Sequence, residues 1–389
     1  MHDSTDKPAP SRLVLVHSGQ APQKVTTVPA GGIKAGLRSW FRRRLDNLIR
    51  LGSDPRRVQL HRALILTRLV RAYLYDCRRF ARAAHLTDPF KNRSTARAHL
   101  LRMAHALEKG QALPAPRPGF GSKKIKRLLH EVQQYQSTFG CDEVSFATVG
   151  VLRGMQQFHA RTGHAEGDWE IALAALEDAE IRAGRPASDG IPSLRLTRAD
   201  IQAALPLDPE AFFWRRCSVR QFEQGPIDRG LLERAIRLAQ KAPSVCNRQS
   251  ARVFIYTDPD EMRTILKHQD GNAGFGHDVA ALMVVTSDLS CFYKDGERNQ
   301  AFVDGGMFAV SLVYALHSLG LGSCLLNWSR GPRDDRKLRH ELGLPDNEVI
   351  ITLLAAGHLR DTFTVAASPR RPLADILVWG TLRRPDSKS

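Results

Sequence analysis

Short apolar runs of strand character alternate with helical patterns along the chain beyond residue 205. The strand-like runs, rich in Val, Ile and Leu, lie at 252–257, 281–287, 323–328 and 349–357. Helical patterns fill the intervals at 229–240, 259–268, 299–319 and 333–342. Each of these helices needs an apolar surface to cover its own apolar stripe. The alternation therefore predicts an α+β fold in which helices flank a central sheet.

The first 200 residues have a different texture and are predicted to be all-helical. Asp54 and Pro55 form a cap and first-turn pair for a helix that continues to about residue 84. Further helical patterns cover about 93–108, 142–161 and 168–183, and another begins at Ser122. We therefore expect a disordered tail at 1–33, a basic helical region at 34–204 and an α/β domain at 205–389.

Positive charge is concentrated in the N-terminal third. The whole chain carries a formal charge of +17, and residues 1–130 contain 27 Lys and Arg against 7 Asp and Glu. The remainder is therefore slightly acidic, which suggests separate roles for the two parts. The stretch 36–50, GLRSWFRRRLDNLIR, combines a Leu, Trp and Phe stripe with arginines. It fits a helix packed on its own domain or peripheral contact with an anionic membrane. Nucleic-acid binding is disfavoured because no recognised motif accompanies the charge.

No segment marks the protein for export or for a membrane. No apolar run reaches the roughly 18 residues of a membrane span, and the N-terminus has no signal-peptide core. The six cysteines form no CxxC pair and no Cys/His cluster with metal-ligand spacing. We therefore expect a cytoplasmic protein with reduced thiols and no metal site.

Three residues at 216–220 can build an anion site. Arg216, Ser218 and Arg220 alternate, so in an extended segment their side chains share one face. Two guanidinium groups and a hydroxyl on one face suit a phosphate, because arginine offers forked donors to phosphate oxygens. The alternative is a solvated basic edge of the domain.

A polar loop follows the helix at 229–240 and precedes the first long strand. It contains Pro243, Ser244, Val245 and Asn247, and its side chains and free amides can hydrogen-bond the edge of a planar heterocycle. The alternative is a turn that satisfies its own backbone. Near the C-terminus, Arg370 and Arg371 could add charge to the same phosphate.

Taken together, these segments resemble the FMN-dependent nitroreductase family over about 207–380. The order is Arg-x-Ser-x-Arg, then Pro-Ser-x-x-Asn-x-Gln, then a late basic Pro-Leu segment. Two further stretches, 271–277 and 304–328, resemble a subgroup whose genes often lie among polysaccharide-biosynthesis genes. The stretch 105–121 is similar to that subgroup's extra helical region. Ser250 and Ser368 depart from the family, which usually has Pro and Lys at these positions.

The resemblance implies a domain-entwined homodimer with a nitroreductase-like α/β sandwich, whose sheet is mixed but mainly antiparallel. FMN would lie at the dimer interface, with NADH or NADPH as the electron donor and an unidentified acceptor. The implied cofactor contacts, in chain order, are Arg216, Ser218, Arg220, Pro243, Ser244, Val245, Asn247, Asn272, Asn327, Trp328, Arg370 and Arg371. The loop at 243–247 would come from the partner, and the backbone of Asn327 and Trp328 would approach flavin N5. No catalytic acid or base is obligatory, because the flavin carries the chemistry.

Two further features leave alternatives open. His105, Glu108 and Arg117 could cover the flavin, or the first two could orient the helix end that Gly110 is expected to terminate. The helix at 299–319 is apolar nearly all round and is predicted to be a core or subunit-interface helix. A rival hypothesis for the whole chain is an accessory protein. Its basic helical region would bind a membrane, an acidic polysaccharide or a partner enzyme.

Overall fold

The computed structural model describes residues 55–113, 116–164, 169–186, 190, 197–203, 206–366, 368 and 370–380. The predicted tail and the 36–50 stretch lie outside these residues. The chain divides into two compact units, Met1–Thr67 and Arg68–Ser389. The sheet, the helices that flank it and the candidate site lie in the second unit. The predicted domain boundaries stay predictions.

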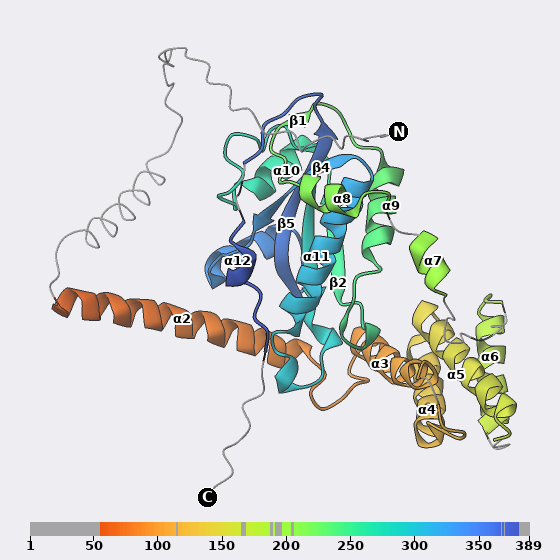
Figure 1. Ribbon diagram of the computed structural model, residues 1–389. Helices are drawn as coiled ribbons and strands as arrows, with labels where there is room; N and C mark the ends of the chain where they lie inside the picture. The colour runs from red at the N-terminus through yellow and green to blue at the C-terminus, as the bar shows by residue number, and fades with distance from the viewer. Residues whose placement is uncertain are drawn as a thin grey trace, which may run out of the picture. The chain divides into compact units, whose positions relative to one another are not determined.

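The centre of the second unit is a five-stranded sheet (Figure 1). Its strands are β1 (Phe222–Glu223), β2 (Ala251–Tyr256), β3 (Ala281–Asp288), β4 (Leu321–Asn327) and β5 (Glu348–Leu359). The long β5 lies between β3 and β4, β2 is at the edge beyond β3, and β1 pairs with the end of β5. All named pairs are antiparallel, while Ser218 forms a parallel bridge to Ser323 on β4. The predicted mixed, mainly antiparallel sheet is confirmed.

Helices cover both faces of the sheet. On one face, α9 (Arg229–Ala239) and α11 (Gln300–Ser318) pack through an apolar core against β3, β4 and β5. On the other, α10 (Pro259–Leu266) and α12 (Pro332–Glu341) form a second core. Every residue of β3 is buried, as a strand covered on both faces requires. Short elements complete the unit: α7 (Arg198–Ala203), α8 (Pro209–Arg215), and 3-10 turns η2 (Val245–Asn247), η3 (Leu289–Cys291), η4 (Asp295–Glu297) and η5 (Leu373–Asp375).

The predicted all-helical region is confirmed for the described residues before 187. Its helices are α2 (Pro55–Ala83), α3 (Arg93–Gln111), α4 (Ser122–Phe139), α5 (Glu143–Arg161) and α6 (Glu170–Arg182). Capping boxes start α3 at Asn92 and α5 at Asp142, where each side chain accepts a bond from the N3 amide. Helices α3 to α6 share one apolar core of their own.

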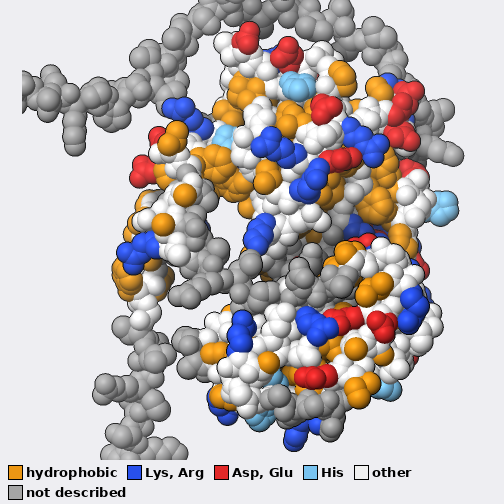
Figure 2. Space-filling view, turned by 90° about the vertical axis from the view of Figure 1, so that its right-hand side faces the viewer, with side chains coloured by type: hydrophobic (Ala, Val, Ile, Leu, Met, Phe, Trp, Pro, Cys, Tyr) orange, Lys and Arg blue, Asp and Glu red, His pale blue; other side chains and the backbone are white. Residues whose placement is uncertain are grey.

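Helix α3 also contacts the α/β domain. Ala98 of α3 shares a small core with Phe80 of α2 and Phe292 after η3, and Val245 of η2 packs against it. The amide of His85 donates to the carbonyl of Phe292 across 3.0 Å. The helical region therefore supports the loop that begins at Val245. On the face shown in Figure 2, basic side chains are interspersed with acidic ones and apolar patches.

Gly110 and Gly305 each allow a neighbouring side chain to pack closely against a helix. Gly110 does not end α3, which continues to Gln111. A Cβ at Gly110 would collide with the ring of Phe120, so this glycine permits close packing instead. A Cβ at Gly305 would lie 2.5 Å from the side chain of Ile351, whereas nothing lies within 4 Å of one at Gly306. Gly305 therefore lets α11 sit closely on β5.

The apolar helix α11 is buried on one side only. Leu312 and Leu316 lie fully in the core, while Phe302, Val303 and Val310 are about half exposed on the other side. The stretch Asp295–Ser318 is long and apolar enough to cross a membrane, but half of it is buried inside the fold. Its packing on the sheet identifies it as a core helix with one uncovered apolar stripe.

Candidate active site

The predicted anion-binding residues lie along strand β4. Ser218 bridges to Ser323, and the amide of Val219 donates to the Ser323 carbonyl across 2.9 Å. A Cβ at Gly322 would meet Val219 at 3.1 Å, so the close approach of this segment to β4 favours glycine there. Arg216 has extended backbone, and in extended backbone alternate side chains share one face. The shared face of Arg216, Ser218 and Arg220 stays a prediction.

Helix α8 ends directly before Arg216 and positions it at the start of the segment beside β4. Asp208 caps the start of α8, and Arg216 follows its end with φ −66° and ψ 116°, which turns the chain into extended backbone. The helix is held on the far end of α11, where the ring of Phe212 lies 5.0 Å from that of His317. His317 Nε2 also lies 3.1 Å from the Phe212 carbonyl oxygen.

The two arginines of the segment have no acidic partner among the described residues. Arg216 is half-buried, and Arg220 is exposed, with its Nη1 3.5 Å from the Ser218 carbonyl oxygen. Burial raises the pKa of the neighbouring Cys324 thiol, and the Arg220 guanidinium opposes that rise. By contrast, Arg252, Arg263 and Arg360 in the same domain all pair with carboxylates. Unpaired guanidinium groups beside a hydroxyl are the chemistry that an anionic ligand requires.

The turn after β4 lies at the other end of the same strand. Asn327 accepts a bond from Gln269 Nε2 on its carbonyl at 3.2 Å, and its side-chain Oδ1 accepts from the amide of Ser329 at 3.0 Å. Asn327 lies three residue steps along the strand from Cys324, which is beside Arg220, and this corresponds to about 10 Å. The structure therefore brings the arginine segment and the Asn327 turn to one strand.

Gln269 also fixes the glycine-rich loop. Its Oε1 accepts from the amide of Gly271 at 2.5 Å, and its carbonyl accepts from Asn272 Nδ2 at 2.6 Å. Asn272 Nδ2 also donates to the Leu266 carbonyl at 2.9 Å, so only its side-chain oxygen remains for a ligand. Nothing local in the sequence distinguishes Gln269, because its role depends on the distant carbonyl of Asn327.

The loop that begins at Pro243 is conformationally constrained. Cys246, Asn247 and Gln249 all have φ near +50°, a left-handed conformation that side chains disfavour. Ser244 Oγ accepts from the Gln249 amide at 3.1 Å, and the Val245 amide donates to Asp304 Oδ2 at 3.1 Å. Strained backbone held by such bonds is typical of functional loops.

Arg248 anchors this loop from inside the protein. Its side chain is fully buried and makes a two-pronged ion pair with Glu297, at 2.7 and 3.0 Å. It also donates to the carbonyls of Val245 and Cys291, at 3.1 and 2.7 Å. Burial raises the pKa of Glu297, but bonds from Arg248 and the Tyr293 amide outweigh this, so the pKa lies below its usual value. The buried role of Arg248 was not predicted, because nothing local in the sequence distinguishes it from a surface arginine.

Within one chain, the two halves of the predicted site lie at opposite ends of α11. Val245 is bonded to Asp304 in the first turns of α11. Phe212 of α8, four residues before Arg216, lies beside His317 at the end of the helix. Thirteen helical residues span about 20 Å. The loop at 243–247 therefore cannot contact the same small ligand as Arg216 of its own chain.

The remaining predicted residues make local contacts. Arg370 donates to the carbonyl of Ser368 at 2.7 Å, and Arg371 is exposed. Neither observation places these two arginines beside Arg216. His105 Nδ1 lies 3.4 Å from Glu108 Oε2 within α3. The carbonyl of Arg117 accepts from the Phe120 amide in the turn before α4. These roles in the helical region favour helix orientation over contact with the candidate site.

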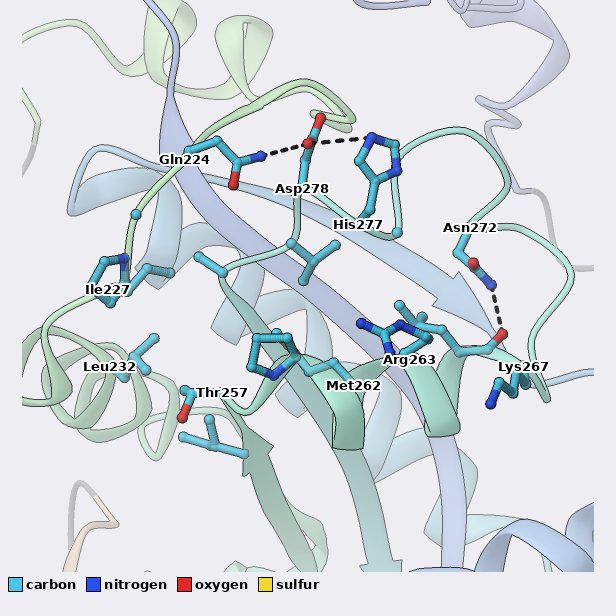
Figure 3. Close-up of a pocket in the computed structure, with 18 of the residues that line it drawn as sticks. Gln224, Ile227, Leu232, Thr257, Met262, Arg263, Lys267, Asn272, His277 and Asp278 are labelled. Carbon is cyan, nitrogen blue, oxygen red and sulfur yellow. Dashed lines mark hydrogen bonds and ion pairs between the residues drawn. The ribbon is translucent and has the colours of Figure 1, made fainter.

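A separate cavity of about 1070 Å³ opens between α9, α10 and the glycine-rich loop (Figure 3). Met262 of α10 and Lys267, which directly follows that helix, line one side, and Gln224 Nε2 donates to Asp278 Oδ1 across 2.6 Å on the other. Asn272 borders this cavity, but Arg216, Ser218, Arg220 and Asn327 do not. We therefore place the candidate active site along β4 and not in this cavity.

Comparison with known proteins matches residues 214–272 and 263–358 to the model of the Nitroreductase family. A curated relative from Thermus thermophilus, named NADH dehydrogenase, is 26% identical, with 46% of this chain and all of the relative aligned. The C-terminal part of the chain therefore contains a nitroreductase-family domain, and its antiparallel sheet flanked by helices is the nitroreductase fold.

Solved structures were also similar. An FMN-dependent nitroreductase from Clostridium difficile is 18% identical, with a TM-score of 0.36, and covers 41% of this chain and 91% of that one. A Desulfovibrio desulfuricans protein in complex with FMN is 21% identical, with a TM-score of 0.39. It covers 46% of this chain and 100% of that one.

Proposed function

We propose that the nitroreductase-family domain at residues 214–358 makes this protein an FMN-dependent oxidoreductase with NADH or NADPH as electron donor. The observation that carries the proposal is the arrangement along β4. There, two arginines that pair with no described carboxylate, together with Ser218, lie in a segment that bridges to the strand ending at the Asn327 turn. The names of the Thermus and Clostridium relatives support the donor and the cofactor.

The residues present fit FMN. A phosphate needs fixed cations, and Arg216 offers a half-buried guanidinium that no described carboxylate occupies. Ser218 and Arg220 follow on the same face toward the ribityl chain and the ring. The backbone at Asn327, about 10 Å farther along β4, is held by Gln269 and would face flavin N5. The Asn272 side-chain oxygen remains for the pyrimidine edge, and Arg370 and Arg371 would add charge at the phosphate.

The second half of the site would come from a second copy of the chain. The loop with Pro243, Ser244, Val245 and Asn247 lies about 20 Å from Arg216 of its own chain, judged from the length of α11. The uncovered stripe of Phe302, Val303 and Val310 on α11 offers a surface for that second copy. A homodimer satisfies both observations, because it buries the stripe and supplies the missing loop.

When bound, FMN would supply the hydride-transfer chemistry between the nicotinamide and the acceptor. The chain's own residues bind and orient. Arg216 neutralises the phosphate, Arg220 stabilises negative charge at the ring edge, and Gln269 holds the Asn327 turn in place. No side-chain acid or base is required at the reacting atom. For the acceptor, we propose a metabolite of polysaccharide biosynthesis, on the sequence resemblance of 105–121 and 304–328 alone.

FMN binding by substituted proteins tests this function. Arg216→Ala removes a charge-assisted contact worth about 1.5–3 kcal/mol, so the Kd for FMN should rise roughly 10- to 150-fold. The double variant Arg216→Ala with Arg370→Ala should bind still more weakly. Arg263→Ala, at an exposed arginine paired with Asp260, is the matched control and should bind FMN like the wild type. Unchanged affinity in the double variant would refute the phosphate site.

A second candidate function is peripheral binding of α2 to an anionic lipid surface. Between residues 55 and 75 this helix carries five arginines and no acidic residue. Leu69, Val70 and Tyr73 are about half to two-thirds exposed and share one helical face, with Arg68 and Arg71 on the opposite side. A basic helix with an uncovered apolar face matches the chemistry of an anionic bilayer.

Vesicle sedimentation tests this second function. The full chain should sediment with phosphatidylcholine vesicles that contain phosphatidylglycerol, and not with phosphatidylcholine alone. Leu69→Glu with Val70→Glu should abolish sedimentation, whereas Ile171→Glu on α6 should not. Equal sedimentation of all three proteins would exclude α2 as the lipid contact.

A further inference from the structure

Asp335 joins the N-terminal helix α2 to the turn beside the candidate site. Its Oδ2 accepts a bond from the Tyr75 hydroxyl at 2.8 Å, and its Oδ1 accepts from Trp328 Nε1 at 2.9 Å. Tyr75 belongs to α2, and Trp328 directly follows Asn327. One buried carboxylate, 7% exposed, therefore connects two segments that are about 250 residues apart in the chain.

The contact from α2 is reinforced on several sides. Arg79 Nη1 lies 3.5 Å from Asp335 Oδ2, and Arg79 also donates to the carbonyls of Asp346 and Glu348 before and within β5. The guanidinium of Arg339 lies 3.4 Å from the Tyr75 hydroxyl oxygen. Burial, and then the bond to Asp335, raise the pKa of Tyr75, so the hydroxyl stays protonated and donates. The α2 end is thus fixed to the domain by polar contacts as well as by Phe80.

The other end of the contact lies at the residues that would face the flavin. Trp328 packs against the core between the sheet and α12, and its indole N–H has Asp335 as its acceptor. On the opposite side, Gln269 holds the carbonyl of Asn327. The turn is therefore held from two directions, and the Asp335 contact leads out of the nitroreductase-family domain.

We infer that Asp335 is a positioning residue through which helix α2 sets the geometry of the 327–329 turn. Loss of the Tyr75 bond would leave Asp335 Oδ2 with the longer 3.5 Å contact to Arg79, so the carboxylate would hold the indole N–H less firmly. The backbone at Asn327 would then sample more orientations toward the flavin. This inference rests on the proposed function for its consequence at the flavin, but not for the coupling itself. Through the Tyr75–Asp335 bond, a ligand on the exposed face of α2 would change the geometry of the 327–329 turn.

Backbone hydrogen exchange of the turn tests the coupling without any cofactor. In Tyr75→Phe, which removes only the hydroxyl, the peptide over 325–331 should exchange about tenfold faster than in the wild type. Tyr73→Phe is the matched control, because Tyr73 lies on the same helix and is 69% exposed. It should exchange like the wild type. Equal exchange in Tyr75→Phe and the wild type would overturn the inference.

The redox potential of bound FMN tests the consequence. Tyr75→Phe and Trp328→Phe should each shift the midpoint potential in the same direction, and the double variant should shift it no further than the larger single change. Additive shifts, or an unshifted potential with unchanged kcat, would refute a positioning role. If the wild type binds no FMN, the proposed function fails, while hydrogen exchange still decides the coupling.

Discussion

The side-chain amide of Gln269 donates a hydrogen bond to the carbonyl oxygen of Asn327 across 3.2 Å, and so joins the loop after α10 to the end of β4. The same side chain accepts from the amide of Gly271, and its backbone carbonyl accepts from Asn272. Two segments that the sequence placed at the flavin are therefore held together by a residue that the sequence did not single out.

Replacing Gln269 should affect the chemistry more than the binding. In Gln269→Ala, the Asn327 carbonyl and the Gly271 amide lose their partners, so the turn at N5 is less well ordered. We expect kcat with NADH to fall about tenfold, with a smaller change in FMN affinity. Steady-state and anaerobic half-reaction kinetics measure this. Gln224→Ala, at the separate cavity, is the control, and an equal loss there would contradict the assignment.

Mixing two inactive chains should restore activity if the site is shared. One chain carries Arg216→Ala and the other Asn247→Ala, and each homodimer should have weakened flavin sites. In the heterodimer, one site would combine the intact Arg216 of one chain with the intact loop of the other. We expect the heterodimer to have about half the activity of the wild-type dimer, because one of its two sites is intact. No recovery in a verified heterodimer would show that each site lies within one chain.

The uncovered stripe of α11 should be needed for dimerisation. Val310 is 50% exposed in the single chain, and an aspartate there would place a charge in an apolar interface. Val310→Asp should therefore sediment as a monomer in analytical ultracentrifugation and lose FMN. Ile171→Asp, at an 80% exposed position on α6, should remain dimeric. A monomeric wild type would contradict the proposed assembly.

The buried pair of Arg248 and Glu297 should contribute strongly to stability. Arg248→Met leaves the Glu297 carboxylate buried without its partner, and we expect a loss of about 3–5 kcal/mol in the free energy of unfolding. The double variant Arg248→Met with Glu297→Leu should be more stable than Arg248→Met alone. Chemical denaturation measures both, and a double variant less stable than the single one would contradict the pairing.

His85 predicts how stability depends on pH. Burial lowers its pKa from 6.5 to about 4, although its bond to the Ser290 carbonyl opposes this. The unfolded chain therefore binds a proton below pH 6.5 that the folded chain resists, so stability should fall between pH 6.5 and 4. His85→Phe should show a weaker decline in this window, measured by denaturation at each pH. An identical pH profile would exclude His85 as its source.

The sequence predicted most elements because their apolar periodicity is local. The run at 281–287 is β3 (Ala281–Asp288), and the pattern at 229–240 is α9. The two-residue β1 was not predicted, since its strand character comes only from pairing with Leu359 and His358 of β5. Short elements of this kind are defined by tertiary contacts.

Only part of the candidate site could be predicted from the sequence. The spacing of Arg216, Ser218 and Arg220 predicted a shared face, because it follows from extended backbone. The roles of Gln269 and Arg248 could not be read in this way. Each depends on a partner more than 40 residues away, namely Asn327 and Glu297. The contacts of Arg370 and Arg371 with a phosphate stay predictions.

Anaerobic reduction of the isolated protein tests the central claim most directly. After purification with FMN supplied, the wild type should show the two visible absorption bands of bound flavin. Addition of NADH or NADPH without oxygen should bleach them, and admission of air or an acceptor should restore them. A colourless protein, or bound flavin that neither nicotinamide bleaches, would contradict the account.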